Sequence, residues 1–213
     1  MHLYLLRHGQ TDWNKDHRIM GAGPVPLNEN GRAMVAELAR ALKPKGISIV
    51  FTSTVTRAFE SACILAGEWG AELREEPRLN ESPFEPWIGK TYHELAHDEN
   101  FKLYFDKPTL ARFSNGEGMA DIQRRALEAV EHIRKETGTG RAAAVSHSDV
   151  IKPVLAHYLG MDLDAIHRLA VANASASLVD FSETPPRVRY INIAPWQWRA
   201  DSIRPAAGGR GAR

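Results

Sequence analysis

Short apolar runs and longer amphipathic segments alternate along most of this chain. The short runs are rich in aliphatic and β-branched residues and several end abruptly in polar residues, as buried strands do. The longer segments carry apolar residues three and four positions apart, which is the spacing of a helix with one buried face. This alternation predicts an α/β domain organised around a central sheet.

The apolar runs place strands at residues 3–6, 47–51, 71–75, a run from 141 that ends in a histidine, 176–181 and 188–193. Helices are predicted over residues 29–42, 55–69, 119–137 and 150–159. Asn28 is expected to cap the first of these helices and Asp149 the last. The strand at 71–75 alternates and is predicted to lie at the sheet edge.

Residues 90–115 are the hardest segment to interpret, because helical pieces within 92–105 are broken by polar residues. The aromatic residues of this segment are expected to pack as a cap over one edge of the sheet: Phe101, Tyr104, Phe105 and Phe113. The whole chain is predicted to form one domain over residues 1–200, with a lid-like insertion at about 82–116. The Gly- and Ala-rich tail at 201–213 is predicted to be disordered.

Composition narrows the class of protein. The 213 residues suffice for one α/β domain, and the formal net charge of +1 gives no field that favours nucleic acid or a membrane surface. No apolar run approaches the roughly 20 residues that span a bilayer. The first strand starts at the N-terminus, which leaves no room for a signal peptide before it. The one cysteine, Cys63, cannot form an internal disulfide and is expected to be a packing residue. A cytoplasmic protein is therefore expected.

Two strands end in a histidine. The first apolar run stops at Arg7, His8 and Gly9, and the run from 141 stops at His147. In open α/β sheets, ligands bind at the carboxyl ends of the strands, and a glycine there lets the backbone approach a bound group closely. A solvated Arg-His pair is the ordinary alternative, and this pattern alone leaves it open.

The stretch Arg-His-Gly-Gln-Thr at 7–11, followed by Asn14, resembles the signature of the histidine phosphatase superfamily, the phosphoglycerate mutase-like proteins. Three further stretches resemble that family's motifs in order. They are Ser-x-x-x-Arg-Ala at 53–58, Leu-x-Glu at 79–81 followed by Trp-x-Gly at 87–89, and Ser-His-Ser at 146–148. The family has glycine where this chain has Ser148, so the pocket beside His147 is expected to differ in shape. The resemblance covers about residues 3–193.

The resemblance implies a three-layer α/β/α sandwich with a mostly parallel sheet. It also implies a nucleophile, His8, that becomes phosphorylated, and a proton donor, Glu81. The implied catalytic set is Arg7, His8, Arg57, Glu81 and His147. Arginine suits phosphate oxygens because its guanidinium is permanently charged and planar. The implied substrate-binding set is Arg7, Gln10, Thr11, Asn14, Arg57, His147 and Ser148.

Neither a metal nor another cofactor is needed by this chemistry, and the partner it implies is a small phosphorylated metabolite. A zinc site built from His8, Glu81 and His147 is the rival, but the chain lacks the His-Glu-x-x-His spacing of a zinc helix. We expect a phosphatase. A cofactor-dependent phosphoglycerate mutase is the second hypothesis, disfavoured by the short stretch between Trp87 and Gly116. A non-catalytic phospho-ligand binding module is the third. The sequence leaves monomer and homodimer open.

Overall fold

A computed structural model describes residues 1–197, and the tail predicted to be disordered lies outside the described residues. One sheet runs through the described part of the chain, in the order β3-β2-β4-β1-β5-β6. Its strands are β1 (His2–Arg7), β2 (Ile49–Thr52), β3 (Glu72–Glu75), β4 (Arg141–Ser146), β5 (Ala176–Asp180) and β6 (Arg187–Ile193). β3, β2, β4 and β1 are parallel, and β5 runs antiparallel to both β1 and β6. The mostly parallel sheet and the edge position of β3 are confirmed.

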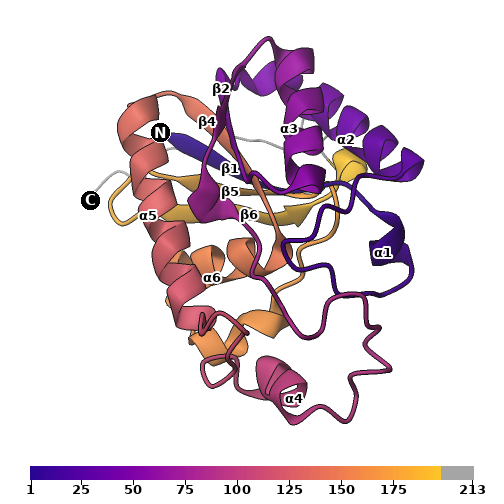
Figure 1. The fold of residues 1–213 in the computed structure, drawn as a ribbon. Helices are drawn as coiled ribbons and strands as arrows, with labels where there is room; N and C mark the ends of the chain where they lie inside the picture. Colours follow the sequence, from indigo (N-terminus) through magenta and orange to yellow (C-terminus); the bar gives the residue numbers. More distant parts are fainter. Residues whose placement is uncertain (198–213) are drawn as a thin grey trace.

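Two pairs of helices cover the two faces of the sheet (Figure 1). One face packs against α2 (Glu29–Leu42) and α3 (Thr56–Trp69), the other against α5 (Met119–Thr137) and α6 (Ser148–Leu159). Two shorter helices, α1 (Asp12–Lys15) and α4 (Glu99–Asp106), lie away from the sheet. Single 3₁₀ turns occur at Lys43–Lys45, Pro77–Leu79, Leu163–Arg168 and Pro195–Gln197. The predicted three-layer α/β/α sandwich is therefore confirmed.

Alternation along the strands explains the two cores. Leu3 and Leu5 of β1 belong to the core under α5 and α6, whereas Tyr4 and Leu6 belong to the core under α2 and α3. The neighbouring strand β4 has three consecutive alanines, all fully buried. Small side chains on this central strand leave room for helices on both faces.

Most predicted elements are found within two residues of their expected ends, with informative exceptions. α6 begins at Ser148 with His147 at the N-cap position, so Asp149 lies inside the first turn and is not the cap. Cys63 is exposed, so its prediction as a packing residue is wrong. The helix α1 is not anticipated by the hydrophobic pattern, because Thr11 and Asn14 hold it through a capping box rather than through apolar contacts.

Two glycines let the first strand end close to a helix. A Cβ on Gly31 would lie 2.0 Å from the Gln10 carbonyl oxygen, and one on Gly9 would lie 2.5 Å from the Gly31 oxygen. Gly31 is unfavourable for a helix by propensity alone. Here its missing side chain allows the first turn of α2 to touch the loop that follows His8.

Residues 82–116, which we call the cap segment and which include α4, lie at the lower end of the molecule in Figure 1. α4 is the only helix of the cap segment in the described structure, and it is shorter than the predicted stretch of helical pieces at 92–105. Aromatic rings hold the segment together: Phe84 is 4.7 Å from Phe113, and Trp87 is 5.1 Å from Phe101, centroid to centroid. The predicted aromatic cap is confirmed, although Phe105 remains 39% exposed.

Candidate active site

A cavity of about 230 Å³ opens where β1 and β4 end and the cap segment begins. Both the strand ends and the cap segment contribute side chains to it. Of the residues predicted for the site, six line this cavity: Arg7, His8, Asn14, Arg57, Glu81 and Ser148. Residues from four separate motifs of the sequence are therefore brought to one place by the fold.

His8 is buried directly after β1, with 2% of its surface exposed. Its Nδ1 lies 2.7 Å from the Gly9 carbonyl oxygen, which can only accept, so Nδ1 carries the proton of the neutral ring. The lone pair is then on Nε2, which accepts a hydrogen bond from Arg57 Nε at 3.2 Å. Burial and the charges of Arg57 and Arg7 hold the pKa of His8 well below its usual range. His8 is thus a neutral imidazole with its free nitrogen in the site.

Two arginines lie near this histidine, the buried Arg57 and the partly buried Arg7. Arg57, in the first turn of α3, donates to the carbonyl oxygens of Gly21 at 2.8 Å and Gly23 at 3.3 Å. Arg7 donates from Nη1 to the Val171 oxygen at 2.6 Å, while its buried Nε has no hydrogen-bond partner. Burial lowers the pKa of Arg57 to about 10, which still leaves it protonated at neutral pH. Within the described residues, neither guanidinium group is hydrogen-bonded to a carboxylate, so both positive charges are available to an anionic ligand.

Glu81 follows the 3₁₀ turn Pro77–Leu79 and keeps only 8% of its side chain exposed. Burial, together with the negative charge of Asp149, raises the pKa of Glu81 to about 8, against the opposing effect of Arg57. Its Oε1 accepts from the Ser82 backbone N–H at 3.1 Å. A carboxyl group held in this way is protonated at neutral pH and can act as a general acid.

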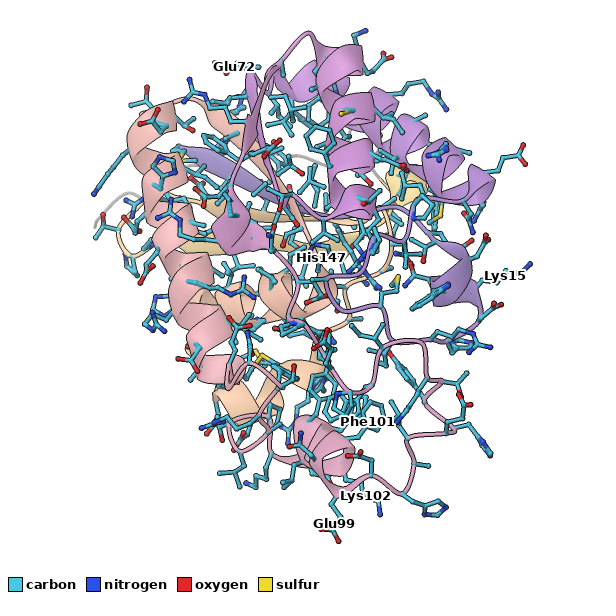
Figure 2. All side chains as sticks on the ribbon, in the orientation of Figure 1. Lys15, Glu72, Glu99, Phe101, Lys102 and His147 are labelled. Carbon is cyan, nitrogen blue, oxygen red and sulfur yellow. The ribbon has the colours of Figure 1, made fainter. Side chains whose placement is uncertain are left out.

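His147 lies next to His8, with the ring centroids 5.2 Å apart, but it does not line the cavity (Figure 2 labels it near the middle of the molecule). Its Nε2 is 2.9 Å from Ser53 Oγ. The Ser53 hydroxyl donates to Asn80 Oδ1 at 2.9 Å, and that atom is an oxygen because it also accepts from the Thr54 backbone N–H.

The one proton of the Ser53 hydroxyl is therefore used, and the remaining bond must come from His147 Nε2–H. This leaves the lone pair of His147 on Nδ1, which is buried without a partner and 3.9 Å from Glu81 Oε2. Burial, Arg57 and His8 hold the pKa of His147 well below its usual range. The short distance to Glu81 therefore joins two neutral groups rather than an ion pair.

The structure gives Gln10 and Thr11 other partners. The Gln10 Oε1 accepts from Asn28 and Asn30 on the α2 side, and Thr11 caps α1. Neither residue lines the cavity, so the geometry gives no support to their prediction as substrate ligands. Asn14 lines the cavity, and its Oδ1 accepts from Asn173 Nδ2 at 3.1 Å.

Several cavity residues escaped the sequence analysis. Asp149, Lys152, Tyr104 and His167 all line the cavity, yet they come from α6, α4 and a 3₁₀ turn with no motif between them. Asn173 Nδ2 also donates to the carbonyl oxygen of His8 at 3.2 Å. The one available signal was the position of Asp149, two residues after the second strand-end histidine.

Within residues 1–197, no group of three or more His, Cys, Asp or Glu side chains is placed to hold a metal ion. The rival zinc site thus finds no ligand set in that range. As for membranes, no helix of the described range combines the length and apolarity needed to cross one.

Comparison with known proteins adds an independent observation. A family model described as histidine phosphatase superfamily (branch 1) matches residues 3–194. A probable phosphoglycerate mutase GpmB from Photorhabdus laumondii is 30% identical over 187 residues, which cover 87% of each chain. Phosphoserine phosphatase 1 from Hydrogenobacter thermophilus is 26% identical over 193 residues, or 90% of this chain and 92% of that one.

A solved structure shares the fold across almost the whole chain. The phosphoserine phosphatase of Entamoeba histolytica, solved with 3-phosphoglyceric acid, matches with a TM-score of 0.84 and 26% identity. The match covers 92% of this chain and 98% of that one.

Proposed function

The chain belongs to the histidine phosphatase superfamily, and from this premise we propose that it hydrolyses a small phosphate monoester through a phosphohistidine on His8. Solved structures similar to this chain include proteins named as phosphatases, among them a mycobacterial glucosyl-3-phosphoglycerate phosphatase. The observation that carries the proposal is the state of His8. Its ring is buried and neutral, and its unprotonated Nε2 accepts a hydrogen bond from the buried Arg57.

In the first step, the Nε2 lone pair of His8 attacks phosphorus and the bond from phosphorus to the ester oxygen breaks. The guanidinium groups of Arg7 and Arg57 stabilise the charge on the phosphoryl oxygens. Glu81 gives its proton to the leaving alkoxide, which its raised pKa equips it to do. Arg57 must first exchange its hydrogen bond to His8 for one to the phosphate.

In the second step, ionised Glu81 takes a proton from water while the water oxygen attacks phosphorus. The bond between phosphorus and Nε2 breaks, inorganic phosphate leaves, and His8 and Glu81 regain their first states. The arginines supply the positive charge in both steps, so we propose a metal-independent reaction. Asn14 and Ser148 are proposed as substrate ligands, with His147 acting next to the phosphate.

We further propose that the cap segment serves as the lid that selects the substrate, on one domain spanning residues 1–200. Phe84, Tyr92, Tyr104 and Phe105 of this segment line the same cavity as His8. A cavity of about 230 Å³ lies below the range of about 300–1,000 Å³ of typical ligand sites, which favours a small metabolite. We place the enzyme in the cytoplasm, where the exposed thiol of Cys63 stays reduced.

A phosphoglycerate mutase is the second candidate, because a relative with that probable activity is 30% identical over most of its length. The two activities share the first step and differ in what accepts the phosphoryl group. Water accepts it in a phosphatase, and a second hydroxyl of the substrate accepts it in a mutase.

The decisive experiment is turnover of a panel of phosphate monoesters by the wild type and by His8→Ala. The panel includes 3-phosphoglycerate with and without its bisphosphate. We expect release of free phosphate by the wild type and its loss in the variant. Isomerised phosphoglycerate with little free phosphate would make the enzyme a mutase, and activity that survives His8→Ala would refute the phosphohistidine.

A further inference from the structure

Two residues that line the cavity each carry a buried polar atom without a hydrogen-bond partner, and the two atoms are chemically opposite. Arg7 Nε is a donor without an acceptor, and Asp149 Oδ1 is an acceptor without a donor. Burying such atoms unpaired costs about 1–3 kcal/mol each, more for charged groups. A ligand that supplies an anionic acceptor to one and a donor to the other would remove both costs.

The surroundings of Asp149 leave the buried Oδ1 without a hydrogen bond. Burial and the nearby Asp149 carboxylate raise the pKa of the Tyr104 hydroxyl well above its usual value. The ammonium group of Lys152 lies 3.9 Å from Oδ1, which is beyond the 2.7–3.2 Å of a hydrogen bond. Arg7 interacts with Asp149 through its charge, but its recorded hydrogen bond goes to the Val171 oxygen.

The cavity walls near Asp149 suit an organic cation. Tyr92, Tyr104 and Phe105 also line the cavity, and aromatic faces attract cations. A metal ion is a poor candidate there, since no group of three His, Cys, Asp or Glu side chains exists anywhere in the described chain to hold one. A carboxylate bonds an ammonium more strongly than a neutral hydroxyl. It would also repel a second anionic group placed at that end of a substrate.

From these observations we propose that Asp149 forms an ammonium subsite, and that the substrate is the phosphate monoester of a small amino alcohol. The inference rests on the proposed function for the identity of the phosphate end. Arg7 and Arg57 take the phosphate, and Asp149 takes the ammonium on the alcohol part.

A pair of nearly isosteric esters tests this. O-phosphoethanolamine and n-propyl phosphate differ in the replacement of an ammonium by a methyl group. Dissociation constants are measured by calorimetry on His8→Ala, which cannot turn the esters over, and on His8→Ala combined with Asp149→Asn. We expect the ammonium ester to bind about 10- to 100-fold more tightly, and Asp149→Asn to remove that preference while binding of the propyl ester changes little.

Asp106→Asn is the matched control, because this substitution removes the same charge from an exposed residue of α4 that does not line the cavity. Equal binding of the two esters, or an equal loss for both in the Asp149 variant, would overturn the proposal. An equal loss of affinity for both esters would mean that Asp149 acts only by orienting Arg7 and does not contact the ammonium group.

Phosphate release by the wild type is measured separately with p-nitrophenyl phosphate. If the wild type releases phosphate from p-nitrophenyl phosphate but the two esters bind equally, only the ammonium subsite is refuted. Absence of release with Asp149-dependent binding of the ammonium ester refutes the phosphatase and supports the subsite.

Discussion

His8, Arg57 and Glu81 form the strand-end wall of the cavity, and Phe84, Tyr104 and Phe105 belong to the wall that the cap segment supplies. On the strand-end wall, buried polar groups have pKa values displaced toward their neutral forms by burial. On the cap wall, rings pack edge to face, as in the contact of Phe84 with Tyr104 at 5.6 Å. Figure 2 labels Phe101 among the side chains beside α4 that form this packing.

This difference between the two walls suggests that the strand-end wall carries out the reaction and that the cap wall recognises the substrate. A buried arginine and a buried carboxyl each give up hydration, which opposes folding. Their presence at the strand ends is explained by a substrate that arrives with negative charge. Packed rings stabilise the cap segment but transfer no proton. We therefore expect changes on the strand-end wall to reduce the rate with every substrate, and changes on the cap wall to act on stability and selectivity.

The largest expected effect follows from Glu81→Gln, which keeps the shape and removes the proton. We expect kcat with alkyl phosphates to fall about 10²- to 10⁴-fold, the range for loss of a general acid. The wild-type rate should fall as the pH rises through about 8, where the raised pKa of Glu81 lies and the acid form is lost. On the acid side, the rate should hold until well below pH 6.5, because the pKa of His8 is depressed.

Rate–pH profiles of both enzymes check this, with Glu85→Gln as the control, since Glu85 is exposed and outside the cavity. The variant should lose the limb near pH 8. Full activity of Glu81→Gln on alkyl esters would assign the proton to another group.

The strand-end wall could be predicted from the sequence because its parts are local. Strands end where apolar runs end, and His8, Arg57, Glu81 and His147 each lie in a short motif of their own. The sheet then brings the motifs together by a topology that the alternation of strands and helices already predicts. What a motif cannot give is the hydrogen-bonding partner from a distant segment, such as Asn80 for Ser53 or Asn173 for Asn14.

The cap wall could be predicted only in outline. Its aromatic residues predict packing, but α4 extends over eight residues, too short to be stable alone, and depends on Phe101 and Tyr104 being buried. Asp149 shows the limit of a local rule. An aspartate near a helix start is a good cap, but the extended backbone of His147 puts the cap two residues earlier. The Asp149 side chain lines the cavity instead, with Lys152 Nζ 3.9 Å from its Oδ1.

A second prediction tests the cap wall through Trp87→Ala. Trp87 is 1% exposed, stacks with Phe84 and contacts Phe101 edge to face. Its Nε1 donates to Asp98 at 3.3 Å. Its truncation should lower the free energy of unfolding by about 3–5 kcal/mol, as measured by denaturant titration. Well below the unfolding temperature, kcat with the same alkyl phosphates should change less than it does in Glu81→Gln.

Trp196→Ala serves as the matched control, because Trp196 is 64% exposed and should leave stability almost unchanged. A fall in kcat for Trp87→Ala as large as that for Glu81→Gln, in protein shown to be folded, would contradict the separation of the two walls.

The smallest expected effect concerns Ser53, which orients His147 without lining the cavity. Ser53→Ala removes the acceptor for His147 Nε2–H and leaves the ring free to change tautomer. Ser53 Oγ also donates to Asn80 and accepts from the Val55 backbone N–H, and the variant loses these bonds as well. The bond to His147 contributes about 0.5–1.5 kcal/mol, so we expect kcat to fall at most about tenfold. Thr54→Ala is the nearby control, since Thr54 is exposed and bonds Asn80 rather than the histidine.

The tautomer itself distinguishes positioning from a general structural role. In the wild type, the nitrogen NMR signals of His147 should report a proton on Nε2 and none on Nδ1. Ser53→Ala should produce a mixture, and Ser53→Thr, which restores the hydroxyl, should recover both the single tautomer and the rate. If Ser53→Ala lowers the rate while the His147 signals stay unchanged, the hydroxyl acts by another route. In that case Ser53 belongs with the packing of the strand end and not with the orientation of its second histidine.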